Sequence, residues 1–164
     1  MTYSIVASDL QAQHLGVAVQ THLSSVGAWV PWIMPGVGAI ATQAQANIRF
    51  GPIGLHLLAS GLTATHTLAA LLASDTHPAT RQVAVLAADG TTACHTGGYC
   101  TPFAGHITAQ GYSVQANMML RDEVPSAMAH AFTTTTGSLV RRLLHSLEAA
   151  EDAGGDVRGL NRLP

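Results

Sequence analysis

The sequence predicts an α+β fold in which helices pack over antiparallel sheets. Strand-like and helix-like segments come in separate blocks along the chain, and neighbouring strand-like segments are joined by short turns. Short turns give antiparallel pairs, because parallel strands need a long crossover connection. Separate blocks give layers, because sheets and helix pairs bury their apolar faces against one another. The chain has 164 residues, which suits one domain with a sizeable core, and we expect residues 1–164 to form it.

The first half of the chain predicts strands followed by a pair of helices. The strand segments are rich in Val, Ile and Ala and cover residues 3–8, 15–20, 28–32 and 37–42. A polar stretch joins the first two and indicates a hairpin. Leu residues at helical spacing then indicate two helices. One runs from Gly51-Pro52 to Gly61, and the other covers residues 64–74 with Thr63 as its cap.

The second half repeats this order. Its strand segments cover residues 82–87, 91–96, 104–109 and 112–117. Asp89-Gly90 is a two-residue hairpin signal between the first two of them. The last two helices are expected over residues 122–133 and 138–153, before Gly154-Gly155.

Charged residues are unusually few in this chain. They make up 10 % of it, against about 25 % in an ordinary domain. A surface this poor in charge predicts that another copy of the chain covers part of it, so we expect a homo-oligomer. The net charge of −2 and the absence of lysine leave no basic footprint for nucleic acid or for an anionic membrane surface.

Nothing in the sequence indicates export or membrane insertion. The start lacks the basic segment of a secretory signal, and Cys94 and Cys100 are expected to be reduced thiols in the cytoplasm. Residues 23–48 form an uncharged run as long as a membrane span. Pro and Gly interrupt this run, and its Gln and Asn side chains would be costly in lipid, so we predict no membrane segment.

The second residue is a threonine that lies just before a predicted strand. Methionine aminopeptidases usually remove Met1 before a small residue, which would leave Thr2 with a free α-amine. Such an amine has a pKa of roughly 7.7–8.0, so it can act as the general base for the hydroxyl of its own residue. Thr2 is therefore a candidate nucleophile. The alternative is an ordinary residue that begins an edge strand.

The chain also contains a series of short segments rich in Gly, Ala and Val. They are Thr2-Tyr3-Ser4-Ile5-Val6-Ala7-x-Asp9, Leu15-Gly16-Val17-Ala18-Val19, Val26-Gly27-Ala28-x-Val30-Pro31-Trp32, Gly36-Val37-Gly38-Ala39-x-Ala41-Thr42-Gln43, Gly51-Pro52-x-Gly54-Leu55 and Gly154-Gly155-Asp156-x-Arg158-Gly159. These segments resemble a bacterial family catalogued as domain of unknown function 1028, which is grouped with the N-terminal-nucleophile (Ntn) hydrolases. The resemblance implies a four-layer αββα sandwich of the Ntn-hydrolase type, with two antiparallel sheets between helix layers.

The chain departs from the family pattern in two places. Ala116 stands where the family has glycine, which adds a methyl group at a place where a ligand would meet the backbone. Family members also continue past the segment that ends at Gly159 into at least one more strand. This chain stops at Pro164, so it is expected to lack the last strand of the family.

Two residues on predicted strands are expected to support Thr2. Asn117 ends a strand, where sites of this fold class gather, and its side-chain amide is a candidate donor to the oxyanion, a contribution worth roughly 3–4 kcal/mol. The alternative is an asparagine that closes a turn. Ser4 shares the strand face of Thr2, because side chains alternate along a strand, and would assist Thr2 or point into a polar pocket.

Further polar side chains are candidate substrate-binding residues. Thr42, Gln43 and Asn47 form a polar cluster after an apolar strand, and would either line a small-molecule pocket or cap the start of the next helix. His106 matches the family pattern and is a candidate pocket residue, whereas several other histidines, such as His66 and His130, are expected to be ordinary polar residues on exposed helix faces.

The nine histidines do not form a metal-binding pattern. No His-x3-His or HExxH spacing is present, and Cys94-His95 with Cys100 lacks a second pair of ligands. No glycine-rich phosphate motif is present either. We therefore predict no metal and no cofactor, and we rank a metal hydrolase built from scattered histidines last among the hypotheses.

The leading hypothesis is hydrolysis of a small amide or related C–N bond in the cytoplasm. Thr2 would attack the small-molecule substrate, its α-amine would move the proton, and Asn117 with backbone N–H groups would hold the oxyanion. The substrate would be neutral or weakly polar, or would carry a carboxylate bound by Arg49 or Arg81. The alternative is a non-catalytic binding or scaffold protein that keeps the sandwich, which both departures from the family pattern favour.

Overall fold

The computed structural model describes residues 1–101 and 103–155. Within these residues, eight strands form two four-stranded antiparallel sheets. The sheet with strand order β2-β1-β8-β7 contains β1 (Thr2–Asp9), β2 (His14–Thr21), β7 (Gly105–Ala109) and β8 (Tyr112–Asn117). The sheet with strand order β3-β4-β5-β6 contains β3 (Pro31–Met34), β4 (Gly38–Ala44), β5 (Arg81–Ala87) and β6 (Thr92–Thr96).

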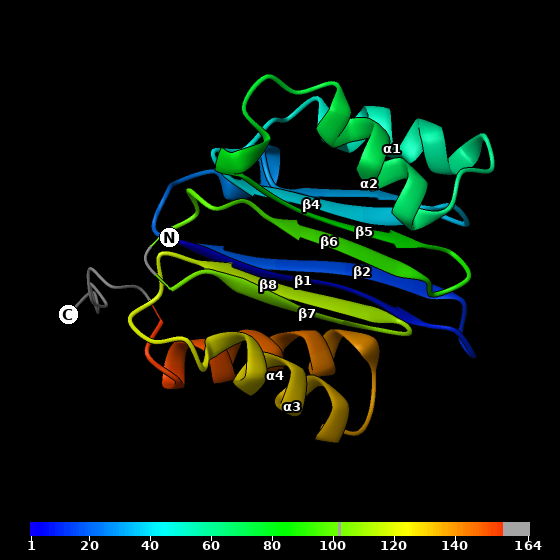
Figure 1. Cartoon of the computed structure of the whole chain (residues 1–164). Helices are drawn as coiled ribbons and strands as arrows, with labels where there is room; N and C mark the ends of the chain where they lie inside the picture. Colours follow the sequence, from blue (N-terminus) through cyan, green and yellow to red (C-terminus); the bar gives the residue numbers. More distant parts are fainter. Residues whose placement is uncertain (102, 156–164) are drawn as a thin grey trace.

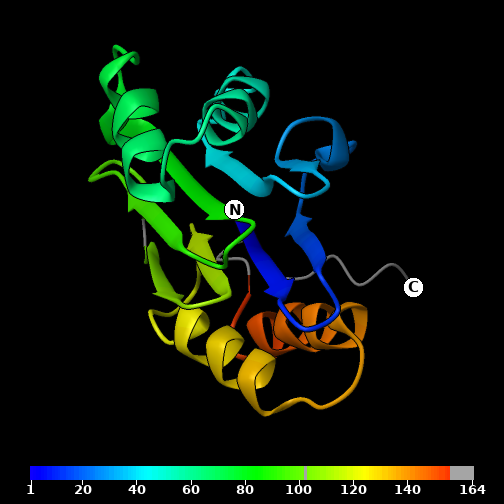
Figure 2. The same ribbon diagram turned by 90° about the vertical axis from the view of Figure 1, so that its right-hand side faces the viewer.

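The sheets and helices are stacked as layers, in the order helix, sheet, sheet, helix (Figure 1). Helices α1 (Phe50–Ala59) and α2 (Ala64–Ala73) cover the outer face of the β3–β6 sheet. Helices α3 (Val124–Thr134) and α4 (Leu139–Asp152) cover the outer face of the other sheet. The view turned by 90° shows the same separation of the two helix pairs (Figure 2). The predicted α+β class, with antiparallel sheets, is confirmed.

Most predicted elements are confirmed, and the second helix begins where expected, with the Thr63 hydroxyl accepting a hydrogen bond from the His66 N–H at 3.2 Å. The predicted strand over residues 28–32 is wrong. Residues Val26–Ala28 form a short 3₁₀ helix, η1, and the strand begins only at Pro31. Proline is tolerated at the first position of an edge strand, where its missing N–H breaks no ladder bond.

The expected loss of the family's last strand cannot be compared with the structure, because residues 156–164 lie outside the described residues.

None of the described helices combines the length and the apolar character needed to cross a lipid bilayer.

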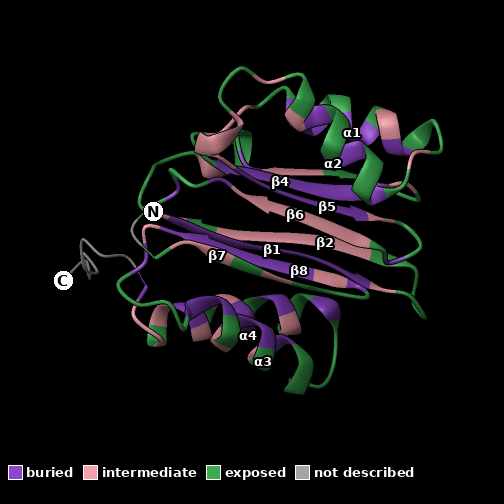
Figure 3. Cartoon of the chain, in the orientation of Figure 1, coloured by how far each residue is buried: buried purple, intermediate pink, exposed green. Residues whose placement is uncertain are grey.

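Alternation along the strands divides the core into three clusters. Ile5 of β1 faces α3 and α4, whereas Ile40 of β4 faces α1 and α2. Val6 and Ala41, one position along each strand, lie between the two sheets. The central strands β1, β8, β4 and β5 are therefore buried on both faces (Figure 3). The space between the sheets can be reached only near its ends and edges.

One buried hydroxyl in the helix layer lacks a partner. Thr67 of α2 is 0 % exposed, and among the described residues its Oγ1 makes no hydrogen bond. An unsatisfied buried hydroxyl costs about 1–3 kcal/mol. Thr42 of β4 is equally buried, but its hydroxyl donates to the Asn47 carbonyl and accepts from the Asn47 N–H, both at 3.3 Å.

We therefore expect Thr67→Val to raise the free energy of unfolding by about 1 kcal/mol, because it removes an unpaired hydroxyl at nearly constant volume. Thr42→Val is the matched control, and should lower the free energy of unfolding by about 1–3 kcal/mol, because it breaks two hydrogen bonds. Urea unfolding followed by circular dichroism measures both. A Thr67→Val protein less stable than the wild type would show that this hydroxyl is satisfied in solution.

Candidate active site

The space between the two sheets is apolar at one end and polar at the other. The apolar end is filled by short side chains such as Val6, Ala41 and Ala84. Near the start of β1, the inward side chains are instead polar and buried, each at most 1 % exposed: Ser4, Gln43, Gln82, Gln115 and Asn117. A buried polar group without a partner costs free energy, so these side chains must bond to one another.

Three glutamines join the two sheets through a chain of hydrogen bonds. Gln43 of β4 donates through Nε2 to Oε1 of Gln82 on β5, at 2.7 Å. Its Oε1 accepts from the hydroxyl of Ser4, on β1 of the opposite sheet, at 2.6 Å. The Ser4 hydroxyl accepts in turn from Nε2 of Gln115 on β8, also at 2.6 Å. We call these four residues the inter-sheet amide network.

Gln82 connects this network to the remaining strands. Its Oε1 accepts a second hydrogen bond, from Asn117 Nδ2 at 2.9 Å. The two N–H groups of its Nε2 are shared among three acceptors, the backbone carbonyls of β8 and β7 at 2.9 and 3.1 Å and Thr96 Oγ1 of β6 at 2.8 Å. Every polar atom of this side chain is therefore used, and Asn117 is held in one orientation.

Thr2 lies beside the network, in the middle of a row of three side chains. In the sheet register Thr2 pairs with Thr21 of β2 on one side and with Asn117 of β8 on the other. Directly opposite residues of antiparallel strands project from the same face, so all three face the space between the sheets. Gln43 Nε2 also donates to the Thr2 carbonyl at 3.3 Å, which ties the strand end to the network.

The hydroxyls of Thr2 and Thr21 share one acceptor. Each donates to the Met1 carbonyl at 2.6 Å, and the two hydroxyl oxygens lie 3.2 Å apart. The Met1 α-ammonium donates to Met118 Sδ at 3.1 Å. Removal of Met1 would take away the shared carbonyl and leave a new α-amine beside both hydroxyls.

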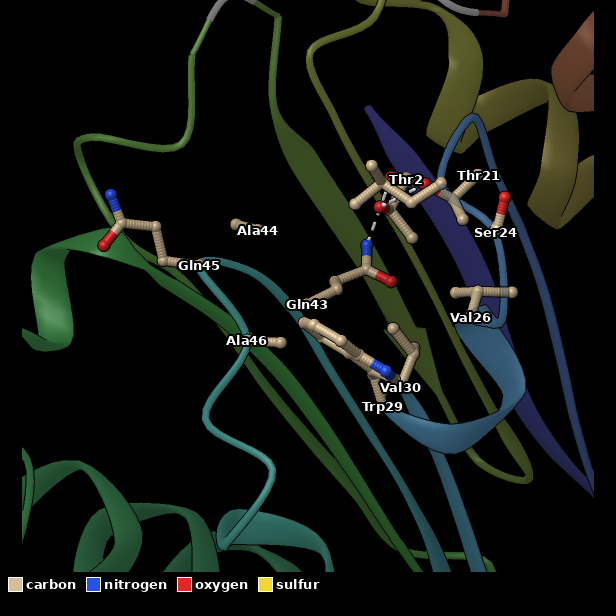
Figure 4. A pocket seen from close by; sticks show the side chains of 11 residues that line it. Thr2, Thr21, Ser24, Val26, Trp29, Val30, Gln43, Ala44, Gln45 and Ala46 are labelled. Carbon is tan, nitrogen blue, oxygen red and sulfur yellow. Dashed lines mark hydrogen bonds between the residues drawn. The ribbon is translucent and has the colours of Figure 1, made fainter.

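Two cavities meet at Thr2. The larger has a volume of ≈ 540 Å³ and is lined by Thr2, Thr21, Leu23, Ser24, Val26, Trp29, Val30, Gln43, Ala44, Gln45 and Ala46. Figure 4 shows Trp29 and Val30 on one wall and the three residues from Ala44 to Ala46 on another. The smaller cavity, ≈ 320 Å³, includes Met1, Thr2, Tyr99, Thr101 and Asn117 in its lining.

The structure brings four of the predicted site residues together. Thr2 lines both cavities, Gln43 lines the larger one and Asn117 the smaller one. Ser4 projects from the same strand face as Thr2, as predicted, and its hydroxyl bonds Gln43 and Gln115 within the inter-sheet amide network. Ser4 therefore holds Gln43 in place.

The predicted cluster of Thr42, Gln43 and Asn47 is not a single cluster. Consecutive residues of a strand point to opposite faces, so Thr42 faces the helix layer while Gln43 faces the other sheet. The Thr42 hydroxyl bonds the backbone of Asn47, and the Asn47 side chain donates to Asp75 Oδ2 at 2.9 Å. Thr42 and Asn47 thus fix the loop after β4.

A partly buried ion pair anchors the same loop. Arg81 Nε donates to Asp75 Oδ2 at 3.0 Å, and the Asp75 side chain is 2 % exposed. Arg81 Nη1 also donates to the Gln45 carbonyl at 2.5 Å. Burial raises the pKa of Asp75, but hydrogen bonds from Arg81, Asn47 and the His77 N–H outweigh it and lower that pKa from 3.8 to about 2. Arg81 is therefore committed to Asp75, which corrects its proposed role as a carboxylate-binding residue.

His106 lies on β7 at the outer end of the hydrogen-bonded chain. Its Nδ1 is 2.8 Å from Thr96 Oγ1, the same hydroxyl that accepts from Gln82. Partial burial and the nearby His95 lower the pKa of His106. His106 is not among the described residues that line either cavity at Thr2. Its side chain is linked to the site through Thr96 and Gln82, and it lies opposite Gln115 in the pairing of β7 with β8.

Thr21, the glutamines Gln82 and Gln115, and Trp29 belong to this site but were not predicted from the sequence. Thr21 follows from the register of the predicted hairpin, because extending its pairing by one position places residue 21 opposite residue 2. Gln82 and Gln115 were detectable as long polar side chains within otherwise apolar strands. Trp29 carried no signal, because the segment around it was assigned to a strand.

The two thiols are not activated. Burial raises the pKa of Cys94 to about 12 and also raises the pKa of Cys100, so neither thiol is a thiolate near neutral pH. Among the described residues, His, Cys, Asp and Glu side chains do not gather in groups of three or more that would suit a metal ion.

Comparisons with known proteins identify a family. The model of DUF1028, a family of unknown function, matches residues 2–162. The crystal structure of a DUF1028 protein from Silicibacter pomeroyi is similar, with a TM-score of 0.90 and 32 % sequence identity, and the match covers 94 % of this chain and 69 % of that one. No curated protein matches the chain.

The inter-sheet amide network predicts a large cost for the loss of Gln82. Gln82→Leu would leave Gln43 Nε2, Asn117 Nδ2 and two backbone carbonyls without this partner, so we expect a loss of more than about 2 kcal/mol in the free energy of unfolding. Gln20→Leu, at an exposed position of β2, is the control and should change it by less than about 0.5 kcal/mol. Similar urea midpoints for the two variants would contradict the network.

The pKa of Asp75 predicts a pH-dependent contribution to stability. Because this pKa falls on folding from 3.8 to about 2, ionised Asp75 stabilises the folded state above about pH 4, and that stabilisation disappears as the pH falls towards 2. Asp75→Asn should therefore lower the free energy of unfolding by about 2 kcal/mol at pH 6 and change it very little at pH 2. The exposed Asp122→Asn serves as control. If Asp75→Asn lowered the free energy of unfolding equally at both pH values, ionised Asp75 would not be the source of the pH dependence.

Proposed function

The chain belongs to DUF1028, a family of unknown function, and on this premise we propose that it is an N-terminal-nucleophile hydrolase that cleaves a small amide or another C–N bond. The observation that carries the proposal is the placement of Thr2. Its hydroxyl lies at the junction of two cavities, next to the position that a free α-amine would take after removal of Met1. Nucleophile and base would then belong to one residue.

The proposed reaction has two steps. In the first, Thr2 Oγ1 attacks the carbonyl carbon while the α-amine takes the hydroxyl proton. The C–N bond then breaks, the leaving amine takes the proton back from the α-ammonium, and an ester to Thr2 remains. In the second step, water attacks this ester with the same α-amine as base, and releases the acid and the free Thr2 hydroxyl.

Asn117 is the proposed oxyanion donor. One N–H of its side-chain amide bonds Gln82, and the residue lines the smaller cavity, so the second N–H is the proposed donor to the oxyanion. A donor held in place before the reaction stabilises the developing charge without reorganisation. Thr21, whose hydroxyl already contacts Thr2 Oγ1, would orient the nucleophile.

A binding protein without catalysis is the second candidate. The specific observation in its favour is that Met1 fits the site well, because its carbonyl accepts from two hydroxyls and its ammonium contacts Met118. Ala116 does not favour this candidate. Its methyl group belongs to the cluster under α3 and α4, on the face of β8 opposite to Asn117.

We also propose that the protein acts in the cytoplasm as a homo-oligomer. The support for a homo-oligomer is a chain with only 10 % charged residues and several exposed large apolar side chains away from the two cavities at Thr2, among them Ile33, Met34, Ile48, Val140 and Leu144. Such side chains are commonly covered by a second subunit.

The hydrolase proposal predicts a processed amino terminus that reacts. Intact-mass measurement of the purified protein should show the loss of one methionine residue. An electrophilic amide probe should label Thr2 in the wild type. Thr2→Ala should reduce labelling and turnover by about 10³-fold or more, and Thr2→Ser should retain part of both. Thr108→Ala, an exposed threonine of β7, should change neither. A retained Met1 would favour the binding protein, and unchanged labelling of Thr2→Ala would refute this nucleophile.

A further inference from the structure

The geometry points to a substrate with an uncharged, apolar acyl group that occupies the larger cavity against Trp29, while the leaving amine occupies the smaller cavity. This inference rests on the proposed function, because it assigns the two cavities to the two sides of the bond that Thr2 would cleave. It goes further by naming the chemical class of the substrate.

The lining of the larger cavity excludes a charged group. None of its described lining residues is Asp, Glu, Lys, Arg or His, and its walls come from Leu23, Val26, Trp29, Val30 and Ala46. The polar side chains of its lining are Thr2, Thr21 and Gln43, which lie together, and Ser24 and Gln45, of which Gln45 lies on the wall across from them (Figure 4). A charge placed between these walls would lose its hydration without gaining a partner, which is costly.

Arg81, which bonds the loop that lines the cavity, does not alter this conclusion. The Arg81 guanidinium donates to the carboxylate of Asp75 and to the Gln45 carbonyl. Its charge is therefore compensated by Asp75 on the far side of the loop that lines the cavity. An acyl group with a terminal carboxylate would have to compete with Asp75 for this arginine.

The size of the larger cavity indicates an aryl group or a medium-length chain. Its volume of ≈ 540 Å³ is roughly 18 times the ~30 Å³ of a liquid water molecule, and lies within the range of small-molecule sites. An acetyl group would leave most of this space filled with water. Trp29 is 56 % exposed, so a ligand in the cavity would cover apolar indole surface, which favours binding.

The position of the α-amine determines which cavity takes the acyl group and which takes the leaving amine. Met1 lines the smaller cavity and not the larger one among the described residues. The α-amine left after removal of Met1 would therefore face the smaller cavity. This amine returns the proton to the leaving nitrogen, so the leaving group must lie on its side of Thr2. The acyl group then extends into the larger cavity.

The test measures binding without turnover. In the double variant Thr2→Ala, Trp32→Phe, Trp29 is the only tryptophan of the chain, and its emission reports on the larger cavity. We expect neutral primary amides to change this emission, with the Kd falling about fourfold for each added methylene from butanamide to octanamide. Octanoate and octylamine, which carry charges on the same chain, should bind at least about tenfold more weakly.

A variant that fills the cavity tests the location. Ala46→Phe, added to the double variant, should raise the Kd for octanamide at least about tenfold and remove most of the dependence on chain length. Ala73→Phe, on the exposed side of α2, is the matched control and should leave the Kd unchanged. If Ala46→Phe does not fold, Trp29→Leu in the Thr2→Ala background, measured by calorimetry, should weaken octanamide binding in the same way.

The outcomes separate this inference from the proposed function. Octanoate or octylamine binding as tightly as octanamide, or no dependence on chain length, would overturn the apolar acyl site whether or not the protein is a hydrolase. Chain-length-dependent binding that Ala46→Phe removes supports the site, even if the wild type shows no turnover. That last combination would overturn the hydrolase proposal and leave a protein that binds apolar amides.

Discussion

The hydrogen bonds among Gln43, Gln82, Gln115 and Ser4 are the constraint on which the rest of the structure depends. They replace apolar packing at one end of the space between the sheets. Apolar contacts tolerate small shifts, but amide hydrogen bonds need short distances and defined directions. A one-residue slip of any participating strand would turn its polar side chain to the other face. The network therefore fixes how the two sheets are placed against each other.

The same network positions the candidate site. Gln43 bonds the backbone of Thr2, and Gln82 holds the side chain of Asn117. The network thus fixes Thr2 and Asn117 from the side of the inter-sheet space. Thr2 also lines both cavities, and Asn117 lines the smaller one. All members of the network are uncharged, so the frame of the site does not change its protonation near neutral pH. The ionic contacts between Asp75 and Arg81 lie outside this frame and stabilise the loop that forms the cavity wall.

The polar and apolar ends of the inter-sheet space have different consequences for function. The apolar end is closed by small side chains such as Ala41 and Ala84, which let the sheets approach closely. The polar end opens beside Thr2, where β1 begins and the connection after β2 leaves the sheet (Figure 1). The candidate reactive groups lie at this end because hydrogen bonds from Gln43 and Gln82 orient them there.

Local patterns in the sequence determined the elements and the candidate nucleophile. The hairpins, the cap at Thr63 and the shared face of Thr2 and Ser4 follow from turn residues and from the two-residue period of a strand, which need no tertiary contacts. Only the tertiary structure decided that Thr42 and Gln43 serve different layers, that Gln82 holds Asn117, and that Trp29 borders a cavity. These relations join residues far apart in the chain, such as Ser4 and Gln115, and no local pattern encodes which two sheet faces will meet.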